Sequence, residues 1–362
     1  MQVALRKLYM RILACMLVLV TTVVTTFAWA GISDYASTER FEISLENDEL
    51  RDFSLLISLD GVNFTDVLDI TEIKKYILMK MYPMSKYDEL TAFSINKMFD
   101  SLNLDPVSTQ RKENNLGPFV NLEMVKQRGF KYSFDATESE LVRKSYFDFD
   151  IYLCYEYTGG QVNDTILNSK HSILLNKINN ILEGKKKNNR LSNDFMFKNY
   201  FQGTVFRNVK VNSASAARVA LSKFPVVDKG KPANYENVSP TNLIIFQGGT
   251  AEPSHNDGVY SFGGLMPAED NLAFVEYNRM NDDYVISNRI LEDFISNRGE
   301  EISIVDSSSR WIVNQNDGLT VDKMIKFNVK MWVEGFDADC FSVINNTPLT
   351  LSLNFSSILN EE

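Results

Sequence analysis

Alternation of apolar and polar side chains is the feature that most constrains how this chain can fold. In "SYFDFDIYLCYEY" (Ser145–Tyr157), one face carries aromatic and aliphatic side chains while acidic side chains lie on the other. The same pattern recurs in "KFNVKMWVE" (Lys326–Glu334) and "LTLSLNF" (Leu349–Phe355). A strict period of two over this length indicates antiparallel strands with one buried face. We therefore predict a mainly β protein, an antiparallel β-sandwich.

Helical patterns are clustered between these strands. Apolar residues are spaced by three and four in "TEIKKYILMKMY" (Thr71–Tyr82) and "KYDELTAFSINKMFDSL" (Lys86–Leu102). The clearest pattern lies in "NSKHSILLNKINNILEG" (Asn168–Gly184), which ends at a glycine suited to a helix C-terminus. Because helices and strands do not alternate one for one, a parallel sheet is disfavoured. We expect residues 31–362 to form a single sandwich domain with helical inserts near 70–130 and 168–184; a small second domain at 70–130 is the alternative.

The first thirty residues have the three parts of a secretory signal peptide. Basic residues precede the apolar run Ile12–Ala30, which closes with the small-x-small ending Ala28-Trp29-Ala30 before Gly31. We expect a signal peptidase to recognise Ala28 and Ala30 and to cleave before Gly31, although the run is also long enough to act as an uncleaved membrane anchor. Either outcome predicts that residues 31–362 are exported to the extracellular space or the cell surface.

Charge and cysteine content narrow the partners. The chain has 37 basic and 47 acidic side chains, a formal net charge of −10, which disfavours binding to nucleic acid. Cys15 lies in the signal segment, which leaves Cys154 and Cys340 in the exported part. An oxidising compartment permits one bridge, so we predict a possible disulfide between Cys154 and Cys340.

Catalytic motifs are missing from the sequence. The two histidines, His171 and His255, do not form an HExxH zinc motif, and no GxSxG nucleophile motif is present. We interpret His171 as a solvated residue of the predicted helix and His255 as part of a surface loop. No catalytic residue and no cofactor is therefore assigned, and the chain is not expected to be an enzyme.

Calcium is the one metal that the sequence leaves open. Three loops contain several oxygen-bearing side chains: "DGVNFTDVLD" (Asp60–Asp69), "RMNDDY" (Arg279–Tyr284) and "NQNDG" (Asn314–Gly318). None has EF-hand spacing, and such residues are common turn formers. We accordingly assign no metal ligands.

The stretch "KMWVEGFDADCF" (Lys330–Phe341) gathers three carboxylates and a thiol in a short space. It could be a metal or nucleophile site, or the end of a strand followed by a turn. Alternation places Trp332 on the outer face, Gly335 lets the chain turn, and Asp337 can accept hydrogen bonds from the turn. We favour the architectural interpretation. Trp332 and Tyr152, both on outer faces, could contact a sugar or pack under an insert, and packing is the preferred interpretation.

Several segments resemble the exported surface proteins of Gram-positive bacteria related to camelysin and TasA. These are "LVTTVVTTFAWAGISDYASTERFEISL", "VNSASAARVALS" (Val211–Ser222) and "IKFNVKMWVEGFDADCF" followed by "LTLSLNF". The resemblance implies a jelly-roll-like sandwich whose last two strands form a closing hairpin, processing by a SipW-type signal peptidase and a biofilm-matrix role. Camelysin-type proteins also carry a metalloprotease label, which the two histidines do not support.

Two functional hypotheses follow. The first is a structural surface protein that acts as a matrix or fibre component. The segment Gly31–Leu45 would then add a strand to the sheet edge of another copy or of another matrix or cell-wall protein. The alternative is a surface adhesin or a glycan- or calcium-binding module that uses loops 247–264 and 306–320. A hydrolase is a third possibility and would need a site without a known motif.

Overall fold

The structure is a computed structural model, and the elements of its fold lie in the unit Ala36–Glu362. The predicted signal segment and its cleavage point lie outside the described residues, and so does loop 279–284. The structure describes residues 36–46, 53–83, 86–109, 111–124, 130–132, 140–159, 161–176, 182–184, 186–189, 209–248, 254–256, 259–261, 302–306, 308–315, 318–335, 337, 339–340 and 349–360. Among these residues, no helix combines the length and apolar character needed to cross a membrane.

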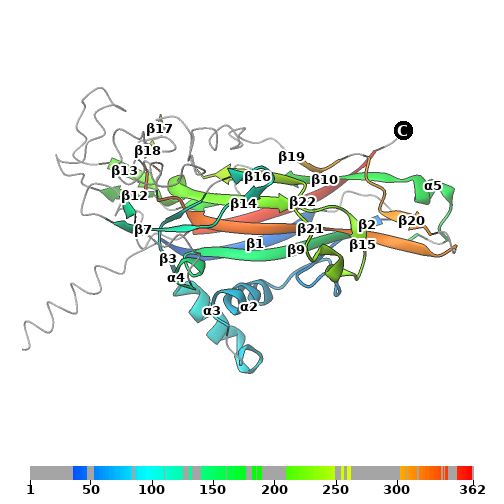
Figure 1. Ribbon diagram of the computed structural model, residues 1–362, viewed down its shortest axis with the longest axis horizontal. Helices are drawn as coiled ribbons and strands as arrows, with labels where there is room; N and C mark the ends of the chain where they lie inside the picture. Colours follow the sequence, from blue (N-terminus) through cyan, green and yellow to red (C-terminus); the bar gives the residue numbers. More distant parts are fainter. Residues whose placement is uncertain are drawn as a thin grey trace, which may run out of the picture. The chain divides into compact units, whose positions relative to one another are not determined.

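Two large sheets dominate the described part of the chain (Figure 1). The six-stranded sheet contains β1 (Ala36–Glu46), β3 (Asn103–Leu104), β10 (Lys170–Asn176), β11 (Leu182–Gly184), β19 (Ile302–Val305) and β22 (Leu349–Asn360). The seven-stranded sheet contains β2 (Phe53–Ser58), β9 (Tyr146–Tyr157), β14 (Ala217–Lys223), β15 (Val227–Asp228), β16 (Asn242–Gln247), β20 (Ile312–Asn314) and β21 (Thr320–Val333).

Smaller sheets and short helices complete the described fold. The small sheets are β4 (Val107–Ser108) with β7 (Val120–Met124) and β8 (Phe130–Tyr132), β5 (Arg111–Lys112) with β6 (Asn115–Leu116), and β12 (Lys186–Asn189) with β13 (Val209–Asn212), β17 (Ser254–Asn256) and β18 (Val259–Ser261). The helices are α2 (Ile70–Met81), α3 (Ala92–Asp100), α4 (Glu140–Arg143) and α5 (Asp164–Asn168), with 3₁₀ turns at Tyr87–Glu89, Ser213–Ala216 and Pro232–Tyr235.

The main core lies between the two large sheets, where the period-two pattern predicts it. The inward side chains of β9 and β21 are fully or almost fully buried, and so are those of β22: Phe147, Phe149, Ile151, Leu153, Tyr155, Ile325, Phe327, Val329, Met331, Val333, Leu349, Leu351, Leu353 and Phe355. Phe327 of one sheet stacks on Phe355 of the other, with ring centroids 6.4 Å apart. The mainly β, sandwich-like fold with antiparallel sheets is therefore confirmed.

The pairing of β1 departs from an otherwise mostly antiparallel arrangement. β1 runs parallel to β22 from Thr38↔Leu349 to Glu46↔Ser356, while its other edge pairs with β3 only at Ala36 and Ser37. The expected closing hairpin of the last two strands is wrong, since β21 belongs to the seven-stranded sheet and β22 to the six-stranded sheet. The chain crosses from one layer to the other between them.

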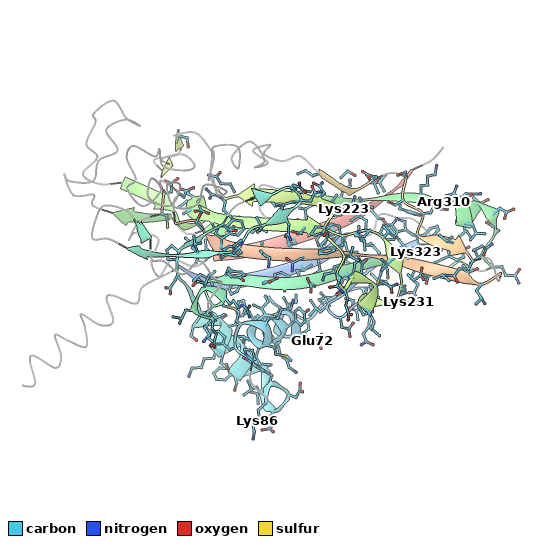
Figure 2. The ribbon with its side chains drawn as sticks, viewed as in Figure 1. Glu72, Lys86, Lys223, Lys231, Arg310 and Lys323 are labelled. Atoms are coloured by element: carbon cyan, nitrogen blue, oxygen red, sulfur yellow. The ribbon has the colours of Figure 1, made fainter. Side chains whose placement is uncertain are left out.

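The insert near 70–130 is helical only in its first part. Asp69 and Thr91 cap α2 and α3 by accepting hydrogen bonds from the backbone N–H groups of Thr71 and Ser94. Both helices bury an apolar face against the main core, and Figure 2 shows Lys86 at the tip of the connection between them. Beyond Asp100 the insert continues as short strands, which corrects the expected helical extent. Its helices share the main core, as the single-domain interpretation requires.

The predicted helix at 168–184 is wrong. The short helix α5 ends at Asn168, and the chain then forms β10, antiparallel to β22, and later β11. His171, Ile173 and Leu175 are fully buried on one face of β10, while Ser172 and Leu174 are also covered on the other. A strand buried on both faces carries an uninterrupted apolar run, which cannot be distinguished from a helix by periodicity alone.

Candidate functional site

The outer face of the seven-stranded sheet, which points away from the main core, is divided into three zones. Cross-strand rows over β14, β21 and β9 define them. The register aligns Arg218 with Trp332 and Tyr146, Ala220 with Lys330 and Asp148, Ser222 with Asn328 and Asp150, and then Lys326 with Tyr152. Both end zones are covered by inserted segments, whereas polar and charged side chains occupy the middle.

Aromatic packing closes one end. Phe119 stacks on Tyr146 with ring centroids 4.0 Å apart and meets Trp332 edge-on at 5.5 Å. Trp332 is 2% exposed. The packing interpretation of Trp332 is therefore confirmed, and the segment that contains Phe119 is the insert that covers it.

A second aromatic group closes the other end. Tyr235, held by a 3.1 Å hydrogen bond from its hydroxyl to the Met324 carbonyl, packs near Tyr152 and Phe224. The three rings surround Lys326, whose Nζ lies 4.8 Å from the Phe224 centroid and 6.0 Å from each tyrosine. Tyr152 is buried as well, as the packing interpretation predicts.

The middle zone is a strip of interlocked charges. Lys330 donates to Asp148 at 2.6 Å, and the Asn328 amide donates to Asp148 at 2.7 Å and to Asp150 at 2.8 Å. Asp150 also pairs with Lys326 at 3.3 Å and with Lys80 of α2 at 3.2 Å. Burial alone would raise the pKa of Asp150, but Lys80 and Lys326 hold it below the ordinary value. The same pairing keeps the pKa of Lys80 raised despite burial, so both groups are charged at neutral pH.

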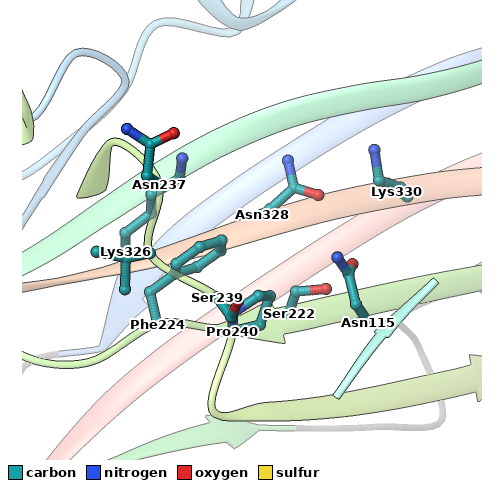
Figure 3. Close-up of a pocket in the computed structure, with 10 residues that line it drawn as sticks. Asn115, Ser222, Phe224, Asn237, Ser239, Pro240, Lys326, Asn328 and Lys330 are labelled. Atoms are coloured by element: carbon teal, nitrogen blue, oxygen red, sulfur yellow. The ribbon is translucent and has the colours of Figure 1, made fainter. Parts of the chain in front are cut away.

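A pocket of about 420 Å³ opens over this strip. Figure 3 shows Lys326, Asn328 and Lys330 on β21, with Ser222 of β14 and Phe224, the residue that follows β14, beside them. The remaining wall comes from the β5–β6 hairpin and the loop after the 3₁₀ turn: Asn115, Asn237, Val238, Ser239 and Pro240. This volume is within the range of about 300–1,000 Å³ that small-molecule sites occupy. The pocket is the candidate functional site, and the sequence analysis did not identify it.

Lys330–Phe341, the carboxylate-rich stretch, is architecture in the structure. Arg218 and Asp337 form a fully buried ion pair, and Asp337 also accepts a 2.7 Å hydrogen bond from the Asp339 backbone N–H. Glu334 accepts a 3.0 Å hydrogen bond from the Trp332 indole. The predicted capping role of Asp337 is confirmed. Its partner, 119 residues earlier in the chain, was not identified from the sequence because nothing local marks it.

The predicted disulfide between Cys154 and Cys340 is absent, since both are free and buried. Cys154 is aligned with Met324, while Cys340 follows the far end of β21 and donates its backbone N–H to Asp337. The intervening length of β21 places them about 25–30 Å apart, whereas a bridge needs Cα atoms within about 7 Å. Burial raises the pKa of both thiols, to about 12 for Cys154.

His171 occupies a buried aromatic box, which corrects its interpretation as a solvated helix residue. Its ring lies 4.6 Å from the rings of both Phe53 and Tyr155, and Trp311 donates to its carbonyl at 3.2 Å. Among the described residues, neither ring nitrogen has a hydrogen-bond partner. Burial lowers the pKa of His171 to about 4, so the ring is neutral at pH 7.

The loop at Asp60 shows how one oxygen-rich segment is used. The Asp60 carboxylate accepts hydrogen bonds from Ser58, from the backbone N–H groups of Val62 and Asn63, and from the Asn63 amide. These bonds tie the turn together. Within the described ranges, no three His, Cys, Asp or Glu side chains are placed to share a metal ion.

Comparison with known proteins gives no relative: the chain matches no family model, no curated protein and no solved structure.

Proposed function

We propose that this chain is an exported structural protein of the cell surface that assembles by exchanging its strand β1 between copies. The observation that supports the proposal is the strand pairing of β1. It pairs in parallel with β22, a strand about three hundred positions later in the chain, and in the described part of the chain its other edge pairs with a strand only at Ala36 and Ser37. The resemblance to matrix proteins and the predicted signal peptide point in the same direction.

Exchange replaces each contact of β1 by the same contact in another copy. Ile43 is buried, and β22 presents Leu349, Leu351, Leu353 and Phe355 to the core beneath it. Removing β1 from its place beside β22 exposes these side chains, so removal is unfavourable in an isolated molecule. When β1 of a second copy takes the same place, the lost burial is restored, and a high protein concentration favours this assembly. The described part of the segment Gly31–Leu45 already lies in the chain's own sheet as β1. Assembly therefore requires exchange of this strand between copies rather than its addition to a free sheet edge.

Cysteine pairing across β1 and β22 tests the proposal directly. Ser44 and Asn354 are register partners. We propose mixing equal amounts of the single variants Ser44→Cys and Asn354→Cys at high protein concentration and then oxidising the mixture. Exchange predicts a mixed disulfide between two different chains, with filaments or oligomers visible by electron microscopy.

Ile358→Cys provides the matched control. Ile358 is exposed on β22, and its aligned partner is Ser172 of β10 rather than a residue of β1. A mixture of Ser44→Cys with Ile358→Cys should give no more than background crosslinking. Equal crosslinking of both mixtures, or monomers alone at every concentration, would rule out exchange of β1.

A further inference from the structure

We infer that the pocket on the outer face of the seven-stranded sheet binds a carbohydrate that carries a carboxylate, such as a uronic acid unit. This deepens the glycan-binding alternative raised by the sequence. It is independent of strand exchange, because β1 lies in the other sheet. Three features support this inference: the unbalanced charge of the polar strip, the hydrogen-bonding groups of the pocket that have unused capacity, and the wall of the pocket that contains Phe224.

The polar strip carries one more positive charge than negative charges. Its ion pairs join three lysines, Lys80, Lys326 and Lys330, to two aspartates, Asp148 and Asp150. Lys326 and Lys330 line the pocket, while neither aspartate is among the lining residues. Each ammonium group has three N–H donors, so one ion pair leaves donors for a ligand. A carboxylate placed between the two lysines would balance the strip, in a chain whose overall charge of −10 otherwise repels anions.

Two polar groups of the pocket have unused capacity. Ser222 is 2% exposed, lines the pocket, and its hydroxyl has no hydrogen-bond partner among the described residues. Asn328, aligned with it across the strands, uses its amide N–H groups on the two aspartates, and its carbonyl oxygen accepts from no described group. A ligand hydroxyl placed between these two pocket-lining groups could hydrogen-bond to both.

The rest of the lining matches a sugar ring better than a phosphate or a peptide. Phe224, Val238 and Pro240 form an apolar wall suited to the C–H face of a pyranose ring. Asn115, Asn237 and Ser239 add amide and hydroxyl groups that suit neighbouring sugar hydroxyls. Arginine, which recognises phosphate in a two-point geometry, is not among the lining residues.

Titration of the full exported chain with matched oligosaccharides tests the inference. Two probes are used: a trisaccharide of 1,4-linked galacturonic acid and the galactose trisaccharide of the same linkage. Calorimetry measures the binding of each probe. Loss of a charged hydrogen bond corresponds to about tenfold in affinity. We therefore expect the acidic trisaccharide to bind at least about tenfold more tightly than the neutral one.

Three variants locate the site. Lys326→Met should weaken binding of the acidic trisaccharide by about tenfold, and Ser222→Ala by about threefold to tenfold. Lys323→Met is the control: Lys323, labelled in Figure 2, lies on the same strand and pairs with Asp228 at 2.5 Å, but it is not among the residues that line the pocket. Circular dichroism and thermal melting establish that each variant is folded.

The outcomes separate cleanly. Selective binding of the acidic sugar, reduced by Lys326→Met and unchanged by Lys323→Met, supports the site. Equal affinity for both sugars, no binding of either, or equal weakening by both lysine variants would overturn it. None of these results affects the crosslinking test, so this inference and the structural proposal can fail separately.

Discussion

His171 is buried between aromatic rings with neither nitrogen hydrogen-bonded within the described structure. A neutral imidazole tolerates this environment, but an imidazolium would need water or a counter-ion. Burial lowers the pKa of His171 to about 4. As pH falls below about 6.5, histidine takes up a proton in the unfolded chain but not in the folded one. Protons therefore favour unfolding between pH 6.5 and 4.

We expect His171→Leu to remove this acid sensitivity. The fall in the free energy of unfolding between pH 7 and pH 4.5 should be about 2–3 kcal/mol smaller in the variant than in the wild type. Urea denaturation at both pH values measures the difference. His255→Leu, which changes the chain's other histidine, is the control. An unchanged pH dependence in His171→Leu would show that the buried ring is not responsible.

Asp337 illustrates how burial and pairing act against each other in a carboxylate. Burial raises its pKa above the ordinary value, although Arg218 opposes the shift. Asp337→Asn removes this carboxylate from the buried Arg218 guanidinium, and we expect a loss of about 3–5 kcal/mol in stability. The double variant Arg218→Met with Asp337→Leu should recover most of that loss, since apolar groups need no partner. Denaturation midpoints of the three variants test this, and strictly additive losses would contradict it.

At the scale of elements, the Tyr87 side chain ties the α2–α3 connection to the end of α2. The Tyr87 hydroxyl lies 3.0 Å from the Leu78 carbonyl and 2.8 Å from the Tyr82 carbonyl, both at the C-terminal end of α2. Tyr87→Phe leaves these oxygens without that donor, and we expect it to destabilise the protein by about 1–2 kcal/mol. Chemical denaturation measures the cost. Tyr157→Phe is the control because, within the described ranges, the Tyr157 hydroxyl has no recorded partner; an equal effect of both changes would argue against the capping role.

Elements with one buried face were predictable from sequence, whereas those buried on both faces were not. β9 and β21 alternate strictly because their outer faces meet polar side chains or inserts, and their inward residues were identified correctly. β10 lies in the sheet with both faces covered, so its pattern "HSILL" matches a helix as well as a strand. Its pairing with β22 is decided by tertiary contacts that no local pattern encodes.

At the scale of the whole molecule, the pocket escaped prediction because its parts are scattered. Asn115, Ser222, Asn237 and Lys330 come from segments far apart in the sequence, and none forms a motif. Sequence alternation placed Asp148, Asp150, Asn328 and Lys330 on an outer face, and of these four Asn328 and Lys330 line the pocket. The other lining residues depend on which inserted segments cover this face. The register between β14 and β21 places Ser222 beside Asn328. A single sequence does not reveal the register of two strands that lie far apart in the chain.

The pairing scheme also predicts an order of local stability across the molecule. β9 and β21 are each paired on both sides, whereas β1 is paired along its length only with β22. We expect backbone amides of β1 to exchange hydrogen through local opening, with less protection than those of β9 and β21.

Ile43→Ala should lower the opening free energy of β1 by about 2–4 kcal/mol, because it removes a buried side chain from that strand alone. Global unfolding loses the same contact, so protection of β9 and β21 that depends on global unfolding should fall by a similar amount, and the difference in protection from β1 should persist. Hydrogen exchange followed by mass spectrometry measures both effects. If β1 is protected as strongly as β9, the strand opens only with global unfolding, and exchange of β1 between folded copies would then be too slow to build an assembly.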